Sequence, residues 1–244
     1  YLLMRTLKKL NVQKVYDLQN SSRTKFYKNI LFPKANFNTW SSSETTLPAE
    51  ISKEEFDKNS VLSRFEYQLK KSGLNTQHTM LPNFSWSCTN IDDIKNENKL
   101  KEYIVLFPFC SAHLDVKKWP YYNELIELIN KNFNNRYKVI IAPGPTEVDD
   151  AKNINATSIL DQNKALSISQ LSTLIKESSF VVANDTGPAH MSAHLGSRGL
   201  TLFGKHTTAF KVSIERENFK AIQVDDLKKL SAEKVFQKIA SILD

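Results

Sequence analysis

The segment Phe180–His194 limits the chain to a small set of folds. An apolar run over Phe180–Ala183 predicts a buried strand of a parallel sheet, and Asn184-Asp185-Thr186-Gly187 then ends it with residue types of turns and helix caps. A short helix follows and ends before Gly196. A strand that enters a helix through small residues leaves backbone N–H groups free at the helix N-terminus, where phosphate binds readily. The segment therefore predicts an α/β protein that binds a phosphorylated ligand.

Strands and helices alternate over residues 100–225. We expect strands at Tyr103–Phe107, Lys138–Ala142, Ser158–Leu160, Phe180–Ala183, Leu200–Phe203 and Ala221–Val224, and helices at Tyr121–Asn132, Glu147–Asn153 and Ser169–Lys176. This alternation predicts a doubly wound parallel sheet. Loops at the carboxyl ends of its strands meet on one rim, where open α/β sheets bind ligands. Four of these loops are rich in polar residues: Pro108–Pro120, Pro143–Glu147, Asn184–His190 and Gly204–Thr208.

The first hundred residues are less regular. We expect a helix over Tyr1–Leu10, a strand at Val15–Leu18, and one long helix over Ile51–Lys71 that Ser52 caps and Gly73 ends. Residues 75–98 have the composition of a linker, and a last helix is expected at Ser231–Leu243. These patterns predict an N-terminal domain with its linker over residues 1–98, a nucleotide-binding domain over 99–228 and a C-terminal helix over 229–244.

The composition limits which binding partners and which cellular compartment we expect for this chain. The net charge of +7 favours anionic partners, but the basic residues are scattered and form no recognised nucleic-acid-binding module, so nucleic acid is not expected. No apolar run approaches the roughly 18 residues that span a bilayer, and no signal peptide is visible. The two cysteines, Cys88 and Cys110, lie far apart in the sequence. These features predict a cytoplasmic protein with reduced thiols.

The loop between Phe107 and Pro120 holds a second set of candidate ligand contacts. Lys117 supplies a point charge for a diphosphate, and Ser111 supplies a hydroxyl on the same rim. We expect Trp119 to anchor the following helix in the core, with Pro120 at the first helical position.

Two metal or phosphate motifs are incomplete. His190 and His194 have the spacing of zinc ligands on a helix, but Met191 follows the first histidine where a zinc protease has glutamate, and no third ligand is placed. Gly199–His206 approaches a P-loop, but its middle reads as a strand. We therefore expect no metal site.

Four segments occur in one order and at similar spacing in a known family: Ser111–Pro120 with its Lys117-Lys118-Trp119-Pro120, Gly144-Pro145-Thr146-Glu147, Asn184–His190 and Leu202–Gly204. They resemble the C-terminal half of glycosyltransferase family 9, the ADP-heptose:lipopolysaccharide heptosyltransferases. The resemblance covers residues 100–225 well and 11–30 weakly. It implies a GT-B fold of two facing Rossmann-like doubly wound domains, with the nucleotide-sugar on the C-terminal one. The N-terminal domain would be incomplete, because the family's first strand and its Gly-Asp loop would lie before Tyr1.

The resemblance also implies roles for individual residues. Lys117, Thr186 and Gly187 match contacts to the donor diphosphate, and Ser111 matches a hydroxyl position of the same site. Glu147 matches the acidic residue that holds the donor ribose, although this loop begins Pro143-Gly144-Pro145 where two glycines are commoner.

Three further assignments concern the sugar, the acceptor and the catalytic group. Asp185 matches a contact to the donor sugar, and His190 matches a neighbour of that site. Arg23, in a segment resembling the family's second strand and its loop, would face the anionic acceptor. The catalytic residue is unknown, because the expected carboxylate would lie before Tyr1.

The resemblance implies an inverting glycosyltransferase. It would move a heptose or a related sugar from a nucleotide diphosphate donor, ADP-heptose, to a lipopolysaccharide core or lipid A acceptor, with a carboxylate deprotonating the acceptor hydroxyl. Lys117, Thr186 and the N–H groups at Gly187 would stabilise the leaving diphosphate, so no cofactor or metal is required. The expected partners are this donor and an anionic glycolipid, with peripheral contact to the inner membrane as an open question.

Three alternatives remain at this point. The chain could be a non-catalytic nucleotide-sugar-binding module, and its charge keeps a nucleic-acid binder as a third class. Asp185 could cap the following helix instead of contacting a sugar.

Overall fold

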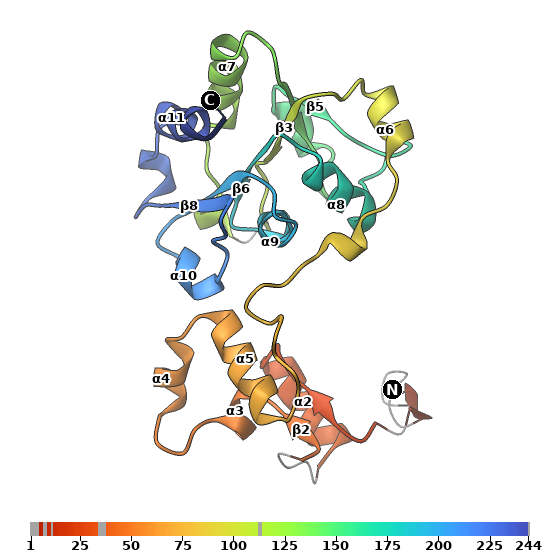
Figure 1. Cartoon of the computed structure of the whole chain (residues 1–244), viewed down its shortest axis with the longest axis vertical. Coiled ribbons are helices and arrows are strands. Elements are labelled where there is room, and N and C mark those ends of the chain that lie inside the picture. The colour runs from red at the N-terminus through yellow and green to blue at the C-terminus, as the bar shows by residue number, and fades with distance from the viewer. Residues whose placement is uncertain (1–4, 7–8, 11, 34–37, 112–113, 244) are drawn as a thin grey trace. The chain divides into compact units, whose positions relative to one another are not determined.

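The computed structural model describes residues 5–6, 9–10, 12–33, 38–111 and 114–243. The chain divides into two compact units, which we call the N-terminal unit (residues 1–81 with 211–213) and the C-terminal unit (82–210 with 214–244). Figure 1 shows the elements of both. The helix expected over Tyr1–Leu10 lies partly outside the described residues.

The N-terminal unit contains a parallel pair of short strands, β1 (Val15–Tyr16) and β2 (Trp40–Ser41), with Val15 opposite Trp40. Its described helices are α2 (Ser22–Leu31), α3 (Ser43–Thr46), α4 (Lys53–Asp57) and α5 (Val61–Lys71). The side chain of Gln68 on α5 is buried and donates to the carbonyls of Asp17 and Ser41, at 3.0 Å each. This amide therefore ties α5 to the ends of both strands.

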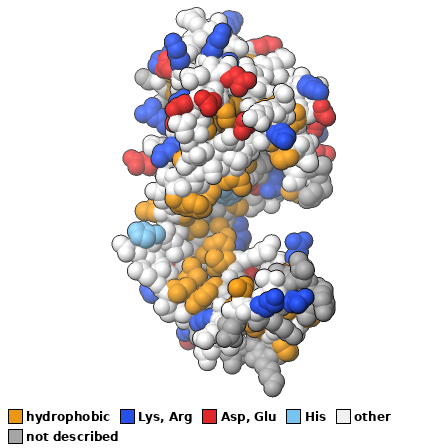
Figure 2. Space-filling model, turned by 90° about the vertical axis from the view of Figure 1, so that its right-hand side faces the viewer, with side chains coloured by type: hydrophobic (Ala, Val, Ile, Leu, Met, Phe, Trp, Pro, Cys, Tyr) orange, Lys and Arg blue, Asp and Glu red, His pale blue; other side chains and the backbone are white. Residues whose placement is uncertain are grey.

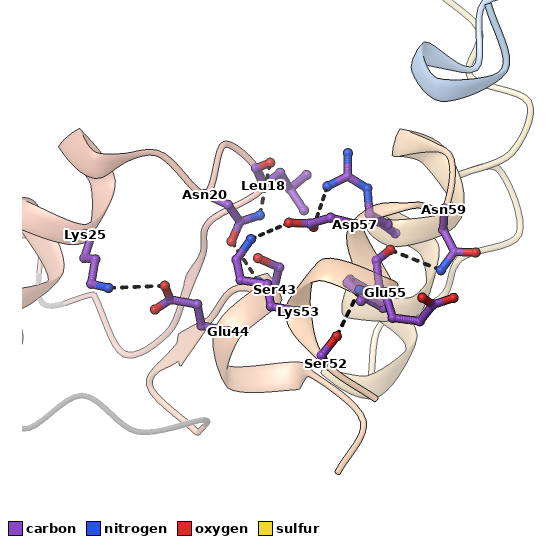
Figure 3. A network of polar contacts seen from close by, with 12 residues as sticks. Leu18, Asn20, Lys25, Ser43, Glu44, Ser52, Lys53, Glu55, Asp57 and Asn59 are labelled. Atoms are coloured by element: carbon purple, nitrogen blue, oxygen red, sulfur yellow. Dashed lines mark hydrogen bonds and ion pairs between the residues drawn. The ribbon is translucent and has the colours of Figure 1, made fainter. Parts of the chain in front are cut away.

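The single helix expected over Ile51–Lys71 is wrong, because two helices occupy this segment. Ser52 caps α4 as expected, but Ser60 caps α5 by accepting a hydrogen bond from the backbone N–H of Ser63. Asp57 pairs with Lys53 on α4 and with Arg64 on α5, at 2.6 and 3.0 Å, so one carboxylate joins the two helices across the break (Figure 3).

A six-stranded parallel sheet forms the centre of the C-terminal unit, which confirms the expected doubly wound architecture. Its order is β5-β4-β3-β6-β7-β8. The winding direction reverses between β3 and β6, and such a switch point opens a crevice at the carboxyl ends of the strands. The strands are β3 (Tyr103–Phe107), β4 (Lys138–Ile141), β5 (Thr157–Ser158), β6 (Phe180–Asn184), β7 (Gly199–Phe203) and β8 (Phe219–Gln223).

Helices cover the sheet because alternate strand residues form two apolar faces. Ile104 and Leu106 of β3 share a buried cluster with residues of α7 (Tyr122–Asn132) and α11 (Ala232–Leu243). Tyr103 points to the other face, where its hydroxyl donates to the carbonyl of Leu174 in α8 at 2.9 Å. The unit's other described helices are η1 (Ser85–Ser87), α6 (Asp92–Glu97), η2 (Asp115–Lys117), η3 (Asp150–Asn153), α8 (Ile168–Lys176), α9 (Gly187–His194) and η4 (Leu227–Lys229). Helix α10 (Ala209–Val212) begins in this unit, and its last two residues belong to the N-terminal unit.

The segment expected to be a linker, residues 75–98, holds η1 and α6. Both pack beside α8: the hydroxyl of Ser87 donates to that of Ser172 at 2.8 Å, and Lys95 pairs with Glu177. Residues 82–98 and the last helix therefore belong to the same compact unit as the sheet. Within this segment Ile91 and Ile94 are buried, and polar side-chain contacts with α8 add to their packing.

Two smaller expectations concern the ends of helices. The helix after Trp119 begins at Tyr122, so Pro120 precedes it and does not occupy its first position. Gly196 follows α9 with a φ of 74°, as expected of a residue that ends a helix in the left-handed region. Across the described residues, no helix combines the length and apolar character that crossing a bilayer demands.

Candidate functional site

A cavity of about 550 Å³ lies at the carboxyl ends of β3, β4 and β6 in the C-terminal unit. Three of the four loops expected to form a site line it, and the fourth, Gly204–Thr208, reaches Asp185 of the cavity through His206. All seven residues expected to bind the donor line this cavity: Ser111, Lys117, Glu147, Asp185, Thr186, Gly187 and His190. The fold thus brings together residues that the sequence spreads over three segments.

Asn184, the last residue of β6, fixes the relative positions of two of these loops. Its side chain is fully buried, and its Nδ2 donates to the carbonyl of Pro108 at 2.8 Å. Its Oδ1 accepts from the backbone N–H of Trp119 and from the hydroxyl of Tyr122, each at 3.2 Å. Because these partners flank η2, the amide holds Lys117 beside the end of β6. Trp119 itself lies in the core, as expected, and its Nε1 donates to the carbonyl of Leu230 at 2.8 Å.

Asp185 is the centre of a cluster of charged and ionisable groups. Its Oδ2 accepts from Lys117 Nζ at 2.7 Å and lies 3.0 Å from His206 Nε2. Its Oδ1 lies 3.6 Å from His190 Nε2. The aspartate side chain is almost fully buried, whereas Lys117 and His190 remain partly open to the cavity.

The cluster keeps Asp185 ionised. Burial opposes ionisation of the carboxyl group, but contacts from His190, Lys117 and His206 outweigh it and hold the pKa of Asp185 well below its usual range. Asp185 therefore acts only as a hydrogen-bond acceptor at neutral pH. Its negative charge is offset locally by Lys117, so an anionic ligand in the cavity does not face an unpaired carboxylate.

The N-terminus of α9 opens into the same cavity. Thr186 is the N-cap residue, and its hydroxyl donates to the carbonyl of Asn184 at 3.3 Å rather than capping the helix. The alternative in which Asp185 caps α9 is therefore wrong. A Cβ placed on Gly187 would meet no atom within 4 Å, so the backbone at the helix start is accessible to a ligand. An accessible helix N-terminus favours a phosphate group.

Glu147 and Ser111 border the cavity from the other two loops. The carboxylate of Glu147 folds back and accepts from the backbone N–H of Gly144 at 2.7 Å. This bond shapes the turn at the edge of the cavity. Ser111 is exposed, and its carbonyl accepts from Leu114 at 2.8 Å, which closes the turn before η2.

Two parts of the site were missed in the sequence. His206 is nine-tenths buried, stacks on Phe203 with ring centroids 6.0 Å apart, and reaches Asp185 from the loop after β7. An apolar wall of Leu166, Ile168 and Leu171 also lines the cavity. The position of His206 after a strand was a usable signal. The wall had none, because Ile168 and Leu171 fit the pattern of an ordinary amphipathic helix and Leu166 lies in the loop before it.

Arg23 belongs to the N-terminal unit and is not among the residues that line this cavity. It occupies the second position of α2 in the N-terminal unit and is exposed. Its expected role toward the acceptor stays a prediction.

Among the described residues, no group of three or more His, Cys, Asp or Glu side chains is arranged to hold a metal ion. Cys88 and Cys110 are free thiols, and burial raises the pKa of Cys110, which lines the cavity.

The fold matches solved structures of GT-B glycosyltransferases. ADP-heptose lipopolysaccharide heptosyltransferase II of E. coli aligns with a TM-score of 0.69 at 16% identity, over 99% of this chain and 80% of that one. The E. coli heptosyltransferase WaaC, solved with ADP, gives 0.63 at 18% identity, over 99% and 77%. A family 9 glycosyltransferase of Veillonella parvula gives 0.71 at 13% identity, over 99% and 77%. The GT-B class expected from the sequence is thereby confirmed.

The sequence settles the family. It matches glycosyltransferase family 9 (heptosyltransferase) over residues 3–240, and the chain belongs to that family. No curated protein sequence matches it significantly.

Proposed function

We propose that this chain is a heptosyltransferase that binds ADP-heptose in the cavity of the C-terminal unit and transfers the heptose, with inversion, to a lipopolysaccharide core or lipid A acceptor. The observation that carries the donor site is the convergence of Lys117, Asp185 and the open N-terminus of α9 on one cavity. A lysine and a helix start attract a diphosphate, and a buried carboxylate accepts from sugar hydroxyls.

The cavity has separate surfaces for the parts of such a donor. The diphosphate fits between Lys117 and the backbone at Gly187, where the helix dipole adds positive potential. Glu147 lies on the rim opposite and suits the ribose hydroxyls. The apolar wall of Leu166, Ile168 and Leu171 suits the flat base. A cavity of about 550 Å³ falls within the range of small-molecule sites.

Departure of the diphosphate requires positive charge where the negative charge develops. Lys117 and the N–H groups at the start of α9 supply it from fixed positions. The reorganisation free energy of the protein is therefore small when the bond to the sugar breaks. Asp185 would orient the sugar through its hydroxyls. We assign acceptor binding and the general base to the N-terminal domain, where Arg23 would face the negative charge of the acceptor. We place the protein in the cytoplasm.

Related solved proteins support the choice of donor. The E. coli WaaC structures contain ADP or ADP-2-deoxy-2-fluoro heptose. We carry this chemistry to the present chain as part of the proposal, because the residues that line its cavity fit it.

Calorimetry with ADP, UDP and GDP tests the donor site. ADP should bind most tightly, and binding should survive EDTA, because Lys117 and the helix start provide the charge that a metal would otherwise supply. Equal affinity for the three nucleotides would refute the adenine preference, and loss of binding on chelation, restored by Mg²⁺, would refute the metal-free site. A transfer assay with ADP-heptose separates the enzyme from the alternative, a nucleotide-sugar-binding module that binds ADP-heptose without turnover.

A further inference from the structure

The net positive charge of this protein is concentrated in its first 81 residues. They contain 13 Lys and Arg against 7 Asp and Glu, whereas residues 82–244 contain 20 against 19. The first segment thus carries +6 of the chain's +7. Figure 2 shows both signs of charge mixed over the C-terminal unit. Charge this unequal between two units points to an anionic partner of the N-terminal unit.

Helix α2 of that unit has an unusual surface. None of its ten residues is buried, and it contains no acidic residue. Phe26 and Ile30 are 58% and 43% exposed. They lie one helical turn apart, so they form a continuous apolar spot on the same face. Thr24, Tyr27, Lys28 and Leu31 are half-buried and form the inner face of the helix.

Cations border the apolar spot on both sides. By helical geometry Arg23 lies beside Ile30 along one edge of the exposed face, and Lys25 lies along the other. Both are exposed, and among the described residues the ammonium of Lys25 lies 3.3 Å from the carboxylate of Glu44, whose side chain is also exposed (Figure 3). Such a pair contributes little in water and leaves the lysine available to another anion.

We infer that the exposed face of α2 rests on the surface of an anionic lipid bilayer. Phe26 and Ile30 would enter the boundary between head groups and acyl chains, and Arg23 and Lys25 would lie among the phosphates. This is the arrangement of helices that lie in a membrane interface. The inference rests on the proposed function in one respect: a glycolipid acceptor would itself lie in a membrane.

A bilayer fits this face better than a protein does. Two apolar side chains on a ten-residue helix cover far less than the roughly 800 Å² that each partner contributes to a stable protein interface. A membrane needs no such area, because its many head groups meet every cation and each basic residue near the surface adds about fivefold in affinity.

Sedimentation with lipid vesicles tests this inference. The whole chain should bind vesicles of phosphatidylcholine with about one-third phosphatidylglycerol, which present a strongly negative surface. It should bind pure phosphatidylcholine vesicles weakly. In 0.5 M salt its affinity for the anionic vesicles should fall on the order of tenfold or more. The double variant Phe26→Ser/Ile30→Ser should lose about tenfold in affinity, Phe26→Trp should retain it, and Lys25→Gln should lose about fivefold.

Matched variants elsewhere provide the controls. Phe210→Ser removes an aromatic residue of similar exposure in α10, and Lys70→Gln removes an exposed lysine at the end of α5; both should bind vesicles like the unaltered chain. Equal binding by the Phe26→Ser/Ile30→Ser variant overturns the assignment of the face. Binding to a DNA duplex as tight as to the vesicles, and equally insensitive to that variant, indicates a general polyanion surface and also overturns it.

The same samples separate the two proposals. A chain that binds ADP but no anionic vesicle refutes the membrane surface and leaves the donor site standing. A chain that binds vesicles through α2 but binds no nucleotide refutes the donor site alone.

Discussion

The ammonium of Lys117 lies 2.7 Å from Oδ2 of Asp185, although 68 positions separate the two residues in the sequence. The same Nζ approaches the carbonyl oxygen of Asp185 at 3.4 Å. An ammonium has three donors, so one remains for a ligand while the other two face the end of β6. The pair therefore both joins two loops of the site and leaves a positive group directed at the cavity.

Lys117→Ala should weaken ADP binding by about 1.5–3 kcal/mol, the range for hydrogen bonds to charged groups. The loss arises because the phosphates lose a positive partner and also meet a less compensated Asp185. Calorimetry measures it directly. Lys118→Ala is the matched control, since this neighbour is exposed and does not line the cavity, so the substitution should leave affinity unchanged. Identical affinity in the two variants would falsify the role of Lys117.

Asp185→Asn should weaken binding of intact ADP-heptose more than binding of ADP, because the amide accepts sugar hydroxyls less well than a carboxylate. It should also lower the free energy of unfolding by about 1–3 kcal/mol, since the charge-assisted bonds from Lys117 and His206 are weakened. Titration with both ligands and urea unfolding provide the measurements. If the variant binds ADP-heptose as well as the unaltered chain does, Asp185 is not a sugar contact.

His206→Ala should reduce affinity for ADP-heptose about fivefold, because one hydrogen bond that positions Asp185 is lost. His206→Gln can still donate to Oδ2 of Asp185 and should recover most of the affinity. A merely structural role predicts a different pattern, in which both variants lower the melting temperature and neither changes donor affinity in the folded protein. That pattern would remove His206 from the site.

Protonation of His194 should make stability depend on pH. Burial, Arg216 and His190 lower the pKa of His194 from 6.5 to about 4, and its Nδ1 lies 3.3 Å from Arg216. Between these values the unfolded chain binds more protons than the folded one, so the free energy of unfolding falls as pH drops from 6.5 to about 4. Because the ring is only half-buried, we expect a loss on the order of 1–2 kcal/mol.

Urea unfolding at pH 7 and pH 4.5 measures this dependence. His194→Gln offers an acceptor to Arg216 without titrating, and its stability should fall less over the same interval. Equal losses in the two proteins would assign the pH dependence to other groups.

The strands of the C-terminal unit could be predicted to within one or two residues, because each central strand is an apolar run bounded by polar turns. The seven donor-site candidates could be grouped for the same reason: parallel strands bring their carboxyl ends to one rim. Sequence patterns fail where order comes from distant partners. Helix α6 is short and mostly polar, and its position depends on the burial of Ile91 and Ile94 and on the pairing of Lys95 with Glu177 beside α8.

The break between α4 and α5 was hidden for a different reason. Ser60 lies inside an otherwise continuous helical pattern, and a serine there is equally compatible with a helix interior on an exposed face. Only the bond from Ser63 to its hydroxyl identifies it as a cap. His206 was missed because its partner, Asp185, lies on a different loop, and no local spacing reports such a pair.

The pairing of β3 with β6 places Ile104 opposite Phe180, while β4 and β5, which come between them in the chain, lie on the far side of β3. During synthesis the loop after β3, which carries Lys117, is therefore made well before the loop after β6, which carries Asp185 and Gly187. Closing this long loop is entropically costly and makes the pairing slow. A ligand held by Lys117 on one side and by Asp185 and Gly187 on the other can bind only after the two halves have joined. Donor binding would thus favour the completed sheet by mass action. The fraction of molecules with a completed sheet would then rise with the cellular concentration of the nucleotide-sugar.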